Sequence, residues 1–412
     1  MPLPEHGLSD DEILDTLRAK RSRDARWRDG RTFGMVFDGG PEVHAIAEQV
    51  ALMFLHENAL NTHAFPSLAE IQSEVVANFA ALVHGETAAG FMTSGGTESC
   101  LMAVKAARER GKLERGIDAP EMVVAESAHA AFHKGGSYFG VRVHKVPVGA
   151  DYRADVDAMA RFVNENTVLV VGSAPQYPQG VIDPIPDLAA LAGSVGASMH
   201  VDACMGGFVL PFMEMNGANL PAWDFRVDGV TTMSADVHKL GYAPKGASII
   251  LHRNKDLRKY QTFVFDDWLG GFYASPNMQG SRPGLPMATA WAVMHKLGVD
   301  GYRRLTRVTI DTHARIVDAI RATPGLRVLG EPDAHLLAMA SDSLDVFALG
   351  DALHAKGGWH LDRQAPPDSL HATVSAGNAA VVEEFVNDLQ SCAAEVAGAR
   401  TDDRSTNYAS LE

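Results

Sequence analysis

The chain has 412 residues, of which 46% are hydrophobic and 21% are charged, and its formal net charge is −15. This length exceeds the size at which one hydrophobic core keeps growing, so we expect one large domain with a smaller one attached. The excess of acidic residues argues against sequence-independent nucleic-acid binding, which relies on basic surface to neutralise phosphates.

The cysteines and the start of the chain indicate where the protein resides. Cys100, Cys204 and Cys392 are widely spaced and form no CxxC pair, so we expect reduced thiols and assign no metal ligands. The first residues lack a basic region followed by an apolar core, and no apolar run reaches the ~18 residues that span a bilayer. We therefore expect a soluble, cytoplasmic protein without a transmembrane segment.

Apolar spacing predicts helices in the first part of the chain. A polar helical pattern runs from Leu8 to about Arg28, and the acids of Ser9-Asp-Asp-Glu12 stand where a helix start favours negative charge. Helical patterns also cover residues 42–57 and 68–84, and the loop between them is a candidate pocket wall. We assign residues 1–57 to an N-terminal helical arm.

Between residues 90 and 253, short β-rich apolar runs alternate with helical stretches. This alternation predicts an α/β fold with a mainly parallel sheet, covered by helices on both faces, in which ligands sit at the carboxyl ends of strands. We assign residues 58–300 to this large domain. The expected strands are residues 122–125, 141–148, 168–172, 199–201, 229–233 and 248–251.

The last part of the chain predicts a second, smaller domain. A long helical pattern leads from Pro286 towards Ile320, and further apolar runs with helical stretches between them fit a compact α+β domain over residues 301–398. We expect residues 399–412 to form a flexible polar tail. The expected strands of the small domain are residues 326–329, 336–340 and 370–375.

A lysine and an aspartate each follow one of the expected strands. Asp202 lies in His200-Val-Asp-Ala-Cys204, and Lys239 lies in a polar, glycine-containing segment. Enzymes that use pyridoxal phosphate (PLP) need a lysine amine that bonds the cofactor aldehyde, and an acid that keeps the pyridine nitrogen protonated. Lys239, its pKa lowered by burial, and Asp202 can fill these roles. Taken singly, the lysine reads as a surface residue and the aspartate as a turn cap, but the pair favours PLP.

A glycine-rich turn precedes a helical run. In Thr93-Ser-Gly-Gly-Thr-Glu-Ser99, close backbone approach, free N–H groups and hydroxyls converge at a helix N-terminus, an arrangement that holds a phosphate. The alternative is a tight turn with a Thr or Ser cap. His238, beside Lys239, is placed to donate to a cofactor phosphate, and His129 is a candidate to stack on the ring and to transfer protons.

These segments belong to an ordered set with counterparts in one known family: Asn58–Ser67, Phe91–Ser99, Ser127–Phe132, Gly172–Gly180, His200–Ala203, Ser234–Gly246 and Tyr273–Gly284. In them the chain resembles the sphingosine-1-phosphate lyases, within the PLP-dependent group II decarboxylase superfamily. The similarity runs from about residue 30 to residue 390. It implies the aspartate-aminotransferase-like fold type I, in an obligate homodimer whose two subunits both line each active site.

The resemblance implies roles for individual residues. Lys239 looks like the imine-forming lysine, Asp202 like the pyridine partner and His129 like the stacking histidine. Tyr177 matches an active-site aromatic position, and Lys245 matches a second lysine near the substrate phosphate, where many amino-acid decarboxylases differ. The residues resembling the phosphate cradle are Gly95, Gly96, Thr97 and His238, with Ser281 reaching in from the neighbouring subunit.

Two positions depart from the family pattern. The family usually has a tyrosine where Phe37 stands and a histidine where Asn61 stands, and both family residues help to bind the substrate phosphate. Losing one such charge-assisted hydrogen bond typically weakens binding by ~1.5–3 kcal/mol. Changes of this size alter substrate preference but leave the cofactor chemistry in place.

These features predict a PLP-dependent carbon–carbon lyase. It would cleave the C2–C3 bond of a phosphorylated sphingoid base, or of a similar phosphorylated amino alcohol, to an aldehyde and phosphoethanolamine. The alternative is a PLP-dependent amino-acid decarboxylase, which the changes at Phe37 and Asn61 keep open. A protein that only binds a partner is disfavoured by the intact Lys239 and Asp202. The candidates for proton transfer are Lys239, Lys245, Tyr177 and His129.

Overall fold

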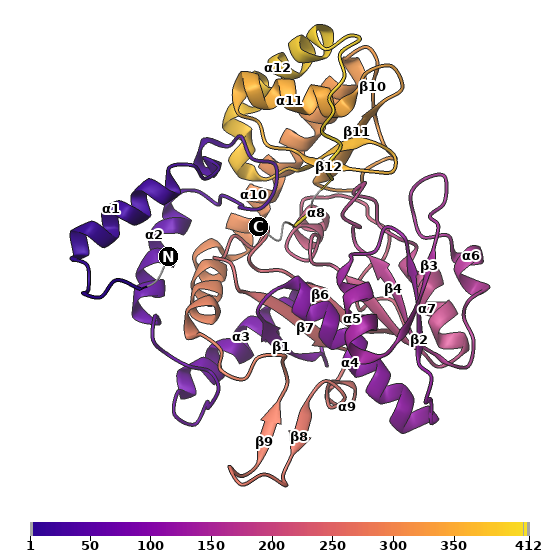
Figure 1. Cartoon of the computed structure of the whole chain (residues 1–412). Helices are drawn as coiled ribbons and strands as arrows, with labels where there is room; N and C mark the ends of the chain where they lie inside the picture. Colours follow the sequence, from indigo (N-terminus) through magenta and orange to yellow (C-terminus); the bar gives the residue numbers. More distant parts are fainter. Residues whose placement is uncertain (1–2, 407, 410–412) are drawn as a thin grey trace.

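The computed structural model describes residues 3–406 and 408–409. The chain forms a large unit and a small unit, and the long helix α10 (Gly284–Ala322) runs from one into the other (Figure 1). The boundary expected at residue 300 falls inside α10, close to Gly298, whose backbone angles interrupt the helix. Among the described residues, no helix is long and apolar enough to cross a membrane.

The large unit is built on one mixed sheet. In the described part of the chain, seven strands pair in the order β1-β7-β6-β5-β4-β2-β3, and only β7 runs antiparallel to its neighbours. The prediction of a mainly parallel sheet is therefore confirmed. The strands are β1 (Ala89–Thr93), β2 (Glu121–Ala125), β3 (Arg142–Val146), β4 (Thr167–Ser173), β5 (Ser198–Asp202), β6 (Val230–Ala235) and β7 (Ser248–His252).

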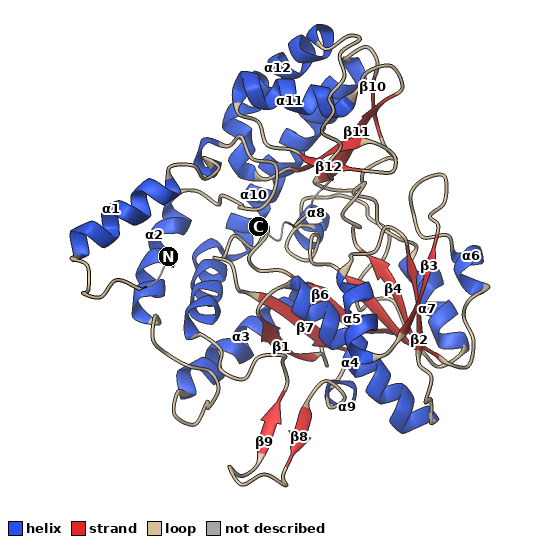
Figure 2. Ribbon diagram, viewed as in Figure 1, coloured by secondary structure: helices blue, strands red, loops and turns tan. Residues whose placement is uncertain are grey.

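Helices cover both faces of this sheet (Figure 2). The central strands β4 and β5 are buried along their whole length, because both of their faces are covered, and this explains their unbroken apolar sequences. The helices of this unit are α2 (Pro41–Met53), α3 (Pro66–Leu82), α4 (Gly96–Arg115), α5 (Ala131–Phe139), α6 (Val156–Ala160), α7 (Ile185–Ser194), α8 (Leu210–Met215) and α9 (Lys255–Arg258). The helices predicted at residues 42–57 and 68–84 are thus confirmed, with small shifts at their ends.

The small unit has its own antiparallel sheet and its own apolar core. Its strands pair in the order β10-β11-β13-β12, and they pack against α11 (Val346–Gly357) and α12 (Val382–Glu395). The α+β prediction for this region is confirmed. The strand β12 was not predicted, because its sequence Asp-Arg-Gln is polar. The strands are β10 (Leu326–Val328), β11 (Leu336–Ser341), β12 (Asp362–Gln364) and β13 (Ser369–Thr373).

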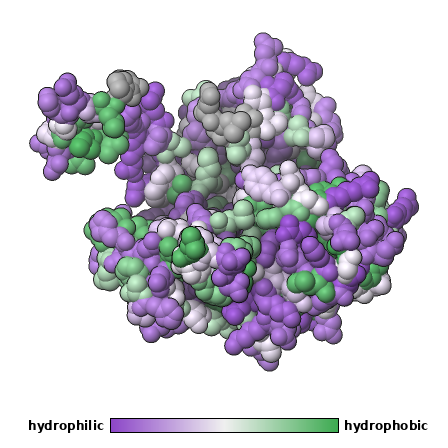
Figure 3. Space-filling model, turned by 60° about the horizontal axis from the view of Figure 1, so that its bottom comes forward, coloured by the Kyte–Doolittle hydropathy of each residue, from purple (hydrophilic) through white to green (hydrophobic). Residues whose placement is uncertain are grey.

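Two elements project from the body of the molecule. Helix α1 (Asp10–Arg21) is described throughout and none of its residues is buried; Ser9 and Glu12 form a reciprocal capping box at its start. Figure 3 shows hydrophobic residues gathered on this arm. The second element is a hairpin of β8 (Phe263–Phe265) and β9 (Tyr273–Ser275), which sequence reasoning did not identify. Phe263, Phe265, Trp268, Leu269 and Phe272 of the hairpin region are exposed.

Candidate active site

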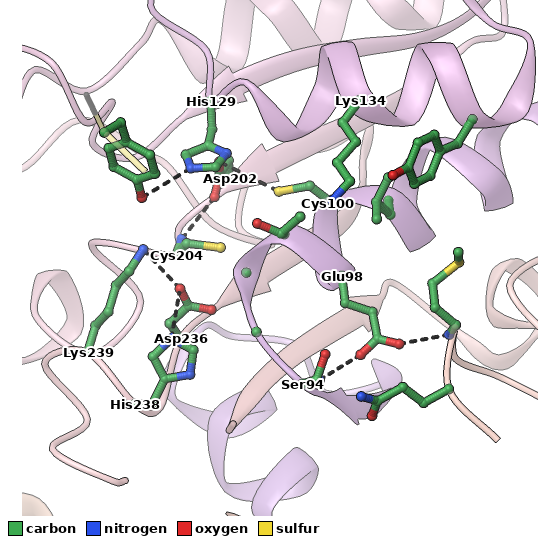
Figure 4. Close-up of a pocket in the computed structure, with 18 residues that line it drawn as sticks. Ser94, Glu98, Cys100, His129, Lys134, Asp202, Cys204, Asp236, His238 and Lys239 are labelled. Carbon is green, nitrogen blue, oxygen red and sulfur yellow. Dashed lines mark hydrogen bonds and ion pairs between the residues drawn. The ribbon is translucent and has the colours of Figure 1, made fainter. Parts of the chain in front are cut away.

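A cavity of about 540 Å³ lies at the carboxyl ends of the parallel strands β5 and β6. The pairing of these strands sets Asp202 beside Ser234, and the chain that continues beyond β6 brings Asp236 and Lys239 to the same cavity (Figure 4). The sheet therefore places side chains that are 37 positions apart in sequence (239 minus 202) around one space.

Lys239 is held by a carboxylate that sequence reasoning missed. Its Nζ lies 2.9 Å from Oδ2 of Asp236, and the two side chains are 17% and 1% exposed. Burial alone would lower the pKa of Lys239, but the Asp236 carboxylate opposes this effect and the pKa is raised above its usual value. The predicted lowering is therefore wrong. Asp236 stands three residues before Lys239 in the same segment, and this spacing was the available signal.

Asp202 is placed to pair with a protonated ring nitrogen. Its Oδ1 accepts hydrogen bonds from the Cys204 N–H (3.0 Å) and the Ser234 hydroxyl (3.1 Å), whereas its Oδ2 has only the Cys100 thiol nearby, at 3.8 Å. Burial alone would raise the pKa of Asp202, but His129, His200 and the Cys204 hydrogen bonds hold it below its usual value. Asp202 is therefore ionised, and one of its oxygens keeps acceptor capacity.

His129 lies between β2 and α5 at the edge of the cavity. Its Nδ1 accepts a hydrogen bond from the Ala131 N–H at 3.1 Å, so the neutral ring carries its proton on Nε2. That nitrogen lies 3.2 Å from the hydroxyl of Tyr408. Burial lowers the pKa of His129, against the opposing effect of Asp202. The ring is therefore neutral near pH 7, which suits stacking and hydrogen-bond donation.

The glycine-rich turn opens the long helix α4, whose first N–H groups have no partner within the helix. A Cβ at Gly96 would lie 2.7 Å from Oδ2 of Asp236 and 2.9 Å from Sγ of Cys204, so this position accepts only glycine. Glu98 holds the turn, since its carboxylate accepts from the N–H groups of Ser94 (2.6 Å) and Met278 (2.7 Å). The cavity lining includes all three predicted cradle positions of this turn, Gly95, Gly96 and Thr97.

His238 and Lys245 lie together beside the cradle. Nδ1 of His238 accepts from the Ala247 N–H at 3.2 Å, so in the neutral ring the proton is on Nε2, 3.7 Å from Asp236. Nζ of Lys245 donates to the carbonyl of His238 at 2.9 Å and lies 4.8 Å from the centre of the Phe37 ring. Burial and the nearby Lys239 lower the pKa of Lys245 to about 8.

Of the other predicted site residues, Tyr177 lies close to Lys239, whereas Asn61 and Ser281 are exposed. Tyr177 shares a small adjoining cavity with Lys239 and donates its hydroxyl hydrogen bond to Oδ2 of Asp362 at 2.6 Å. Asn61 is exposed, and its Oδ1 accepts from the His63 N–H of its own loop at 3.0 Å. Ser281 is also exposed and is not part of the cavity lining; its assignment to a neighbouring subunit stays a prediction.

Two buried thiols were missed by the sequence reasoning. Cys100, at the start of α4, and Cys204, just after β5, bring their sulfur atoms and a carboxylate oxygen of Asp202 within 4.8 Å of one another. Wide sequence spacing gave no signal of this contact, because only the sheet brings α4 over β5. Both thiols line the cavity and have raised pKa values, so they are neutral groups on its wall.

This set of residues fits pyridoxal phosphate. Lys239 supplies the amine, Asp202 supplies an ionised carboxylate with a free oxygen, and the N-terminus of α4 supplies N–H donors at the cavity, where glycine at position 96 avoids a clash with Asp236 and Cys204. When bound, the cofactor contributes an aldehyde that condenses with amines and a ring that withdraws electrons. The amine, the carboxylate and the phosphate-binding N–H groups that PLP chemistry requires therefore all line a single cavity.

Comparisons with known proteins agree with this reading of the cavity. The model of the pyridoxal-dependent decarboxylase conserved domain matches residues 11–339. The sphingosine-1-phosphate lyase of Oryza sativa subsp. japonica is 43% identical over 397 residues, which cover 94% of this chain and 73% of that protein. A probable L-aspartate decarboxylase of Pyrococcus furiosus is 31% identical over 344 residues, 84% of this chain and 91% of that protein.

Solved structures support the same assignment. The sphingosine-1-phosphate lyase of Burkholderia pseudomallei superposes with a TM-score of 0.92 at 39% identity, covering 96% of this chain and 93% of that chain. The glutamate decarboxylase of Lactobacillus brevis, at 22% identity and a TM-score of 0.83, shares the fold, with 97% of this chain and 96% of that chain covered. The predicted fold type I and the predicted cofactor are confirmed: the chain belongs to the pyridoxal-dependent decarboxylase family and uses pyridoxal phosphate.

Proposed function

We propose that this protein is a PLP-dependent lyase that cleaves the C2–C3 bond of a phosphorylated sphingoid base or a similar phosphorylated amino alcohol. Its curated relatives at 35–43% identity over most of the chain are sphingosine-1-phosphate lyases. The structural observation that carries the proposal is the position of Lys245. Its ammonium group donates to the carbonyl of His238, a residue that lines the cofactor cavity, and it offers a cation for the phosphate of a substrate.

The floor of the active site, formed by Lys239, Asp202 and Asp236, holds the cofactor in this proposal. The amine of Lys239 would bond the cofactor aldehyde and would give way to a substrate amine, and the carboxylate of Asp202 would keep the ring nitrogen protonated. His129 presents its neutral ring at the cavity edge as a stacking surface. The cofactor phosphate is assigned to Gly95, Gly96, Thr97 and His238, with Ser281 of a neighbouring subunit.

The cleavage requires two proton movements that these residues can serve. The C3 hydroxyl of the substrate loses a proton, the C2–C3 bond breaks and leaves its electron pair on C2, and C2 takes up a proton. The products are a long-chain aldehyde and phosphoethanolamine. Burial and Asp362 raise the pKa of Tyr177, so Tyr177 stays protonated, and its hydroxyl hydrogen bond goes to Asp362. Lys245, with a pKa of about 8, is present in both forms near neutral pH, and Lys239 and His129 remain candidates.

The two departures from the family pattern differ in their consequences. Phe37 keeps an aromatic ring 4.8 Å from Nζ of Lys245, so it supports this cation even without a hydroxyl. Asn61 uses its side-chain oxygen within its own exposed loop. We therefore assign substrate binding to Lys245, Phe37 and Tyr177, and we expect Asn61 to contribute least.

The test is to incubate the purified, PLP-loaded protein with a phosphorylated sphingoid base and to measure aldehyde and phosphoethanolamine. Equal amounts of both products, formed at a rate that depends on protein concentration, are the expected result. Absence of aldehyde together with release of carbon dioxide from an amino acid would reject the lyase assignment.

The second candidate is a PLP-dependent amino-acid decarboxylase. It is favoured by the 31% identity to the probable L-aspartate decarboxylase and by the exposed, locally bonded Asn61. A decarboxylase would use the same floor residues as a lyase. Its Lys245 would bind a substrate carboxylate instead of a substrate phosphate. A parallel assay for carbon dioxide across the acidic amino acids separates the two.

We also propose that the protein is a homodimer with shared active sites. The exposed apolar side chains of the β8–β9 hairpin and the exposed Leu14 and Leu17 of α1 form surfaces suited to a second copy of this chain. Light scattering during size-exclusion chromatography should give twice the 44.2 kDa mass of one chain. A monomeric mass in an active sample would reject the shared site. We place the dimer in the cytoplasm, because Cys100, Cys204 and Cys392 are free thiols.

A further inference from the structure

Two strands of the small unit hold Tyr177, although Tyr177 lies on the loop after β4 of the large unit. Its hydroxyl donates to Oδ2 of Asp362 in β12 at 2.6 Å. The ring of His371 in β13 lies against the ring of Tyr177, at a centroid distance of 4.0 Å and an interplanar angle of 36°. Asp362 and His371 stand directly opposite each other in the pairing of β12 with β13. One rung of the small sheet therefore holds both the hydroxyl and the ring of Tyr177.

The histidine of this rung is fixed and uncharged. His371 is fully buried, and its ring nitrogens lie 3.3 Å from the Pro178 carbonyl and 3.0 Å from the Thr373 hydroxyl. Burial lowers the pKa of His371 to about 3, so the ring is neutral near pH 7. His371 therefore acts as a flat support for the ring of Tyr177, and Asp362 is the charged member of the rung.

The hydroxyl of Tyr177 is held at the edge of the active site. Tyr177 shares the small cavity beside Lys239, and Tyr177 and Asp362 both line a cleft of about 760 Å³. His129 lines the small cavity, the cleft and the cofactor cavity, so the three spaces adjoin one another. The side chain of Tyr177 therefore carries a contact of the small unit to the space around Lys239.

The hydrogen bond of Tyr177 has a fixed direction. Burial and Asp362 raise the pKa of Tyr177, so the proton stays on the phenol and points at the carboxylate. The phenol oxygen can still accept from a second donor, since a tyrosine hydroxyl both donates and accepts. Burial raises the pKa of Asp362, against the opposing effects of Tyr177 and His360. Asp362 therefore takes up a proton more readily than an exposed aspartate does.

We propose that Asp362 is a positioning residue that directs the hydroxyl of Tyr177, so that Tyr177 takes the proton of the substrate C3 hydroxyl. As that proton reaches the oxygen of Tyr177, the proton of Tyr177 passes to Oδ2 of Asp362. The electron pair of the O–H bond forms the carbonyl of the aldehyde, and the pair of the C2–C3 bond stays on C2. Asp362 returns its proton to solvent through the cleft that it lines. This step rests on the proposed lyase function.

Three variants of the full-length, PLP-loaded protein test the pair of Tyr177 and Asp362. Asp362→Asn keeps an oxygen that can accept from Tyr177, but its amide cannot take up the proton. Tyr177→Phe keeps the ring against His371 and removes the hydroxyl, and the third variant combines both changes. Asp388→Asn is the matched control, because Asp388 of the small unit also accepts from an aromatic side chain, Nε1 of Trp359, at 2.9 Å.

The first measurement is steady-state kinetics with a phosphorylated sphingoid base. Asp362→Asn should lower kcat on the order of 10²–10⁴-fold, whereas KM and the affinity for PLP should change little. Tyr177→Phe should lower kcat by a similar factor, and the combined variant should lower it no further, because the two residues act as a unit. Asp388→Asn should match wild type. A wild-type kcat in Asp362→Asn, or single losses that multiply in the combined variant, would reject the pair.

The second measurement requires no substrate. Protein labelled with fluorinated tyrosine is followed by fluorine NMR, and the signal of Tyr177 is identified by its loss in Tyr177→Phe. This signal should shift as the pH falls through the pKa of Asp362, because the hydrogen bond then ends on a carboxylic acid instead of a carboxylate. The shift should vanish in Asp362→Asn and persist in Asp388→Asn.

Other titratable groups of the described residues also face the pair. His360 stands two residues before Asp362, His371 lies across the rung, and the ring of Tyr408 lies 5.2 Å from that of Tyr177. A shift that persists in Asp362→Asn would come from one of these groups and would overturn the assignment. Absence of aldehyde with wild-type protein would reject the lyase function, and the step at C3 with it. Aldehyde formed at the wild-type rate by Asp362→Asn would leave the lyase function in place and reject only the role of Asp362.

Discussion

The floor of the active site and its mouth are built in different ways. On the floor, Asp202 and Asp236 stand at or just beyond the ends of two paired strands, and their ionised carboxylates are held by buried partners. At the mouth, Lys245 lies on a loop and Tyr408 lies on the C-terminal segment, both outside the helices and strands. The cofactor chemistry therefore depends on the rigid sheet, and substrate choice depends on parts that can change or move without disturbing it.

The largest effect is expected on the floor, at Lys239. Lys239→Ala should abolish turnover and remove the visible absorbance of bound cofactor, because no other amine replaces the bond to the aldehyde. Lys239→Ala also leaves Asp236 without its ion-pair partner, so Lys239→Arg, which keeps a cation there, separates loss of chemistry from loss of folding. Retained absorbance in both variants, without a bond to another lysine, would contradict the assignment.

The second change on the floor is Asp202→Asn. The amide oxygen can still accept from Cys204 and Ser234, so the fold should persist, but the ring nitrogen loses its anionic partner. We expect kcat to fall on the order of 10²–10⁴-fold, the size of effect typical of a positioned proton-handling group. Cofactor affinity measured by titration should change less than kcat. A variant with near wild-type turnover would show that another group protonates the ring.

At the mouth, Lys245→Ala should leave the cofactor bound and weaken use of the phosphorylated substrate. Loss of one charge-assisted contact of ~1.5–3 kcal/mol corresponds to a fall in kcat/KM of about 10- to 150-fold. Steady-state kinetics with absorbance spectra of the same samples measure both quantities. Lys255→Ala, in the short helix α9, is the control. Unchanged turnover would remove the structural reason for preferring the lyase.

The pKa of about 8 at Lys245 predicts that KM for the phosphorylated substrate depends on pH through this residue of the mouth. The residues of the floor should not cause this dependence. Below this value Lys245 is a cation and binds phosphate; as the pH rises through it, the charge is lost and KM should rise. The substrate phosphate has finished its own ionisation by then, since its second pKa is about 6. In Lys245→Arg the rise in KM should disappear, because arginine keeps its charge. An identical profile in that variant would contradict the role of Lys245.

The smallest effect is expected at Phe37. Replacing its ring, as in Phe37→Leu, removes a cation–π contact of about 0.5–1 kcal/mol and should raise KM by roughly two- to fivefold. Phe37→Tyr should keep the contact and add a hydroxyl, so its KM should equal or fall below that of wild type. If Phe37→Leu weakens cofactor binding more than it raises KM, then Phe37 supports the cofactor and not the substrate.

The floor could be predicted from sequence more completely than the mouth. Strands and the residues at their ends follow from local apolar runs, and Lys239 and Asp202 could be paired from their positions alone. The partner Asp236 was missed although it stands three residues before Lys239, because this spacing alone does not show which side chains face each other after a turn. The sequence also did not show that Asn61 would bond within its own loop or that Lys245 would donate to the His238 carbonyl, since local hydrogen bonds depend on how the loops settle on the sheet.

The tail shows a further limit of sequence reasoning. Arg404 reaches Asp345 and Asp368, and Tyr408 reaches His129, across separations of 36 to 279 positions. No local periodicity encodes contacts of this range in a polar segment. The hairpin of β8 and β9 was missed for a related reason, because its exposed side chains follow no buried pattern.

The most direct test of the account is to reduce the PLP-loaded protein with borohydride, digest it and map the modified peptide by mass spectrometry. We predict that the pyridoxyl group is found on Lys239 and that Lys245, six residues further on, is unmodified. Modification of a different lysine in the folded protein, or of none at full cofactor occupancy, would contradict the central claim that Lys239 and Asp202 define the floor of this active site.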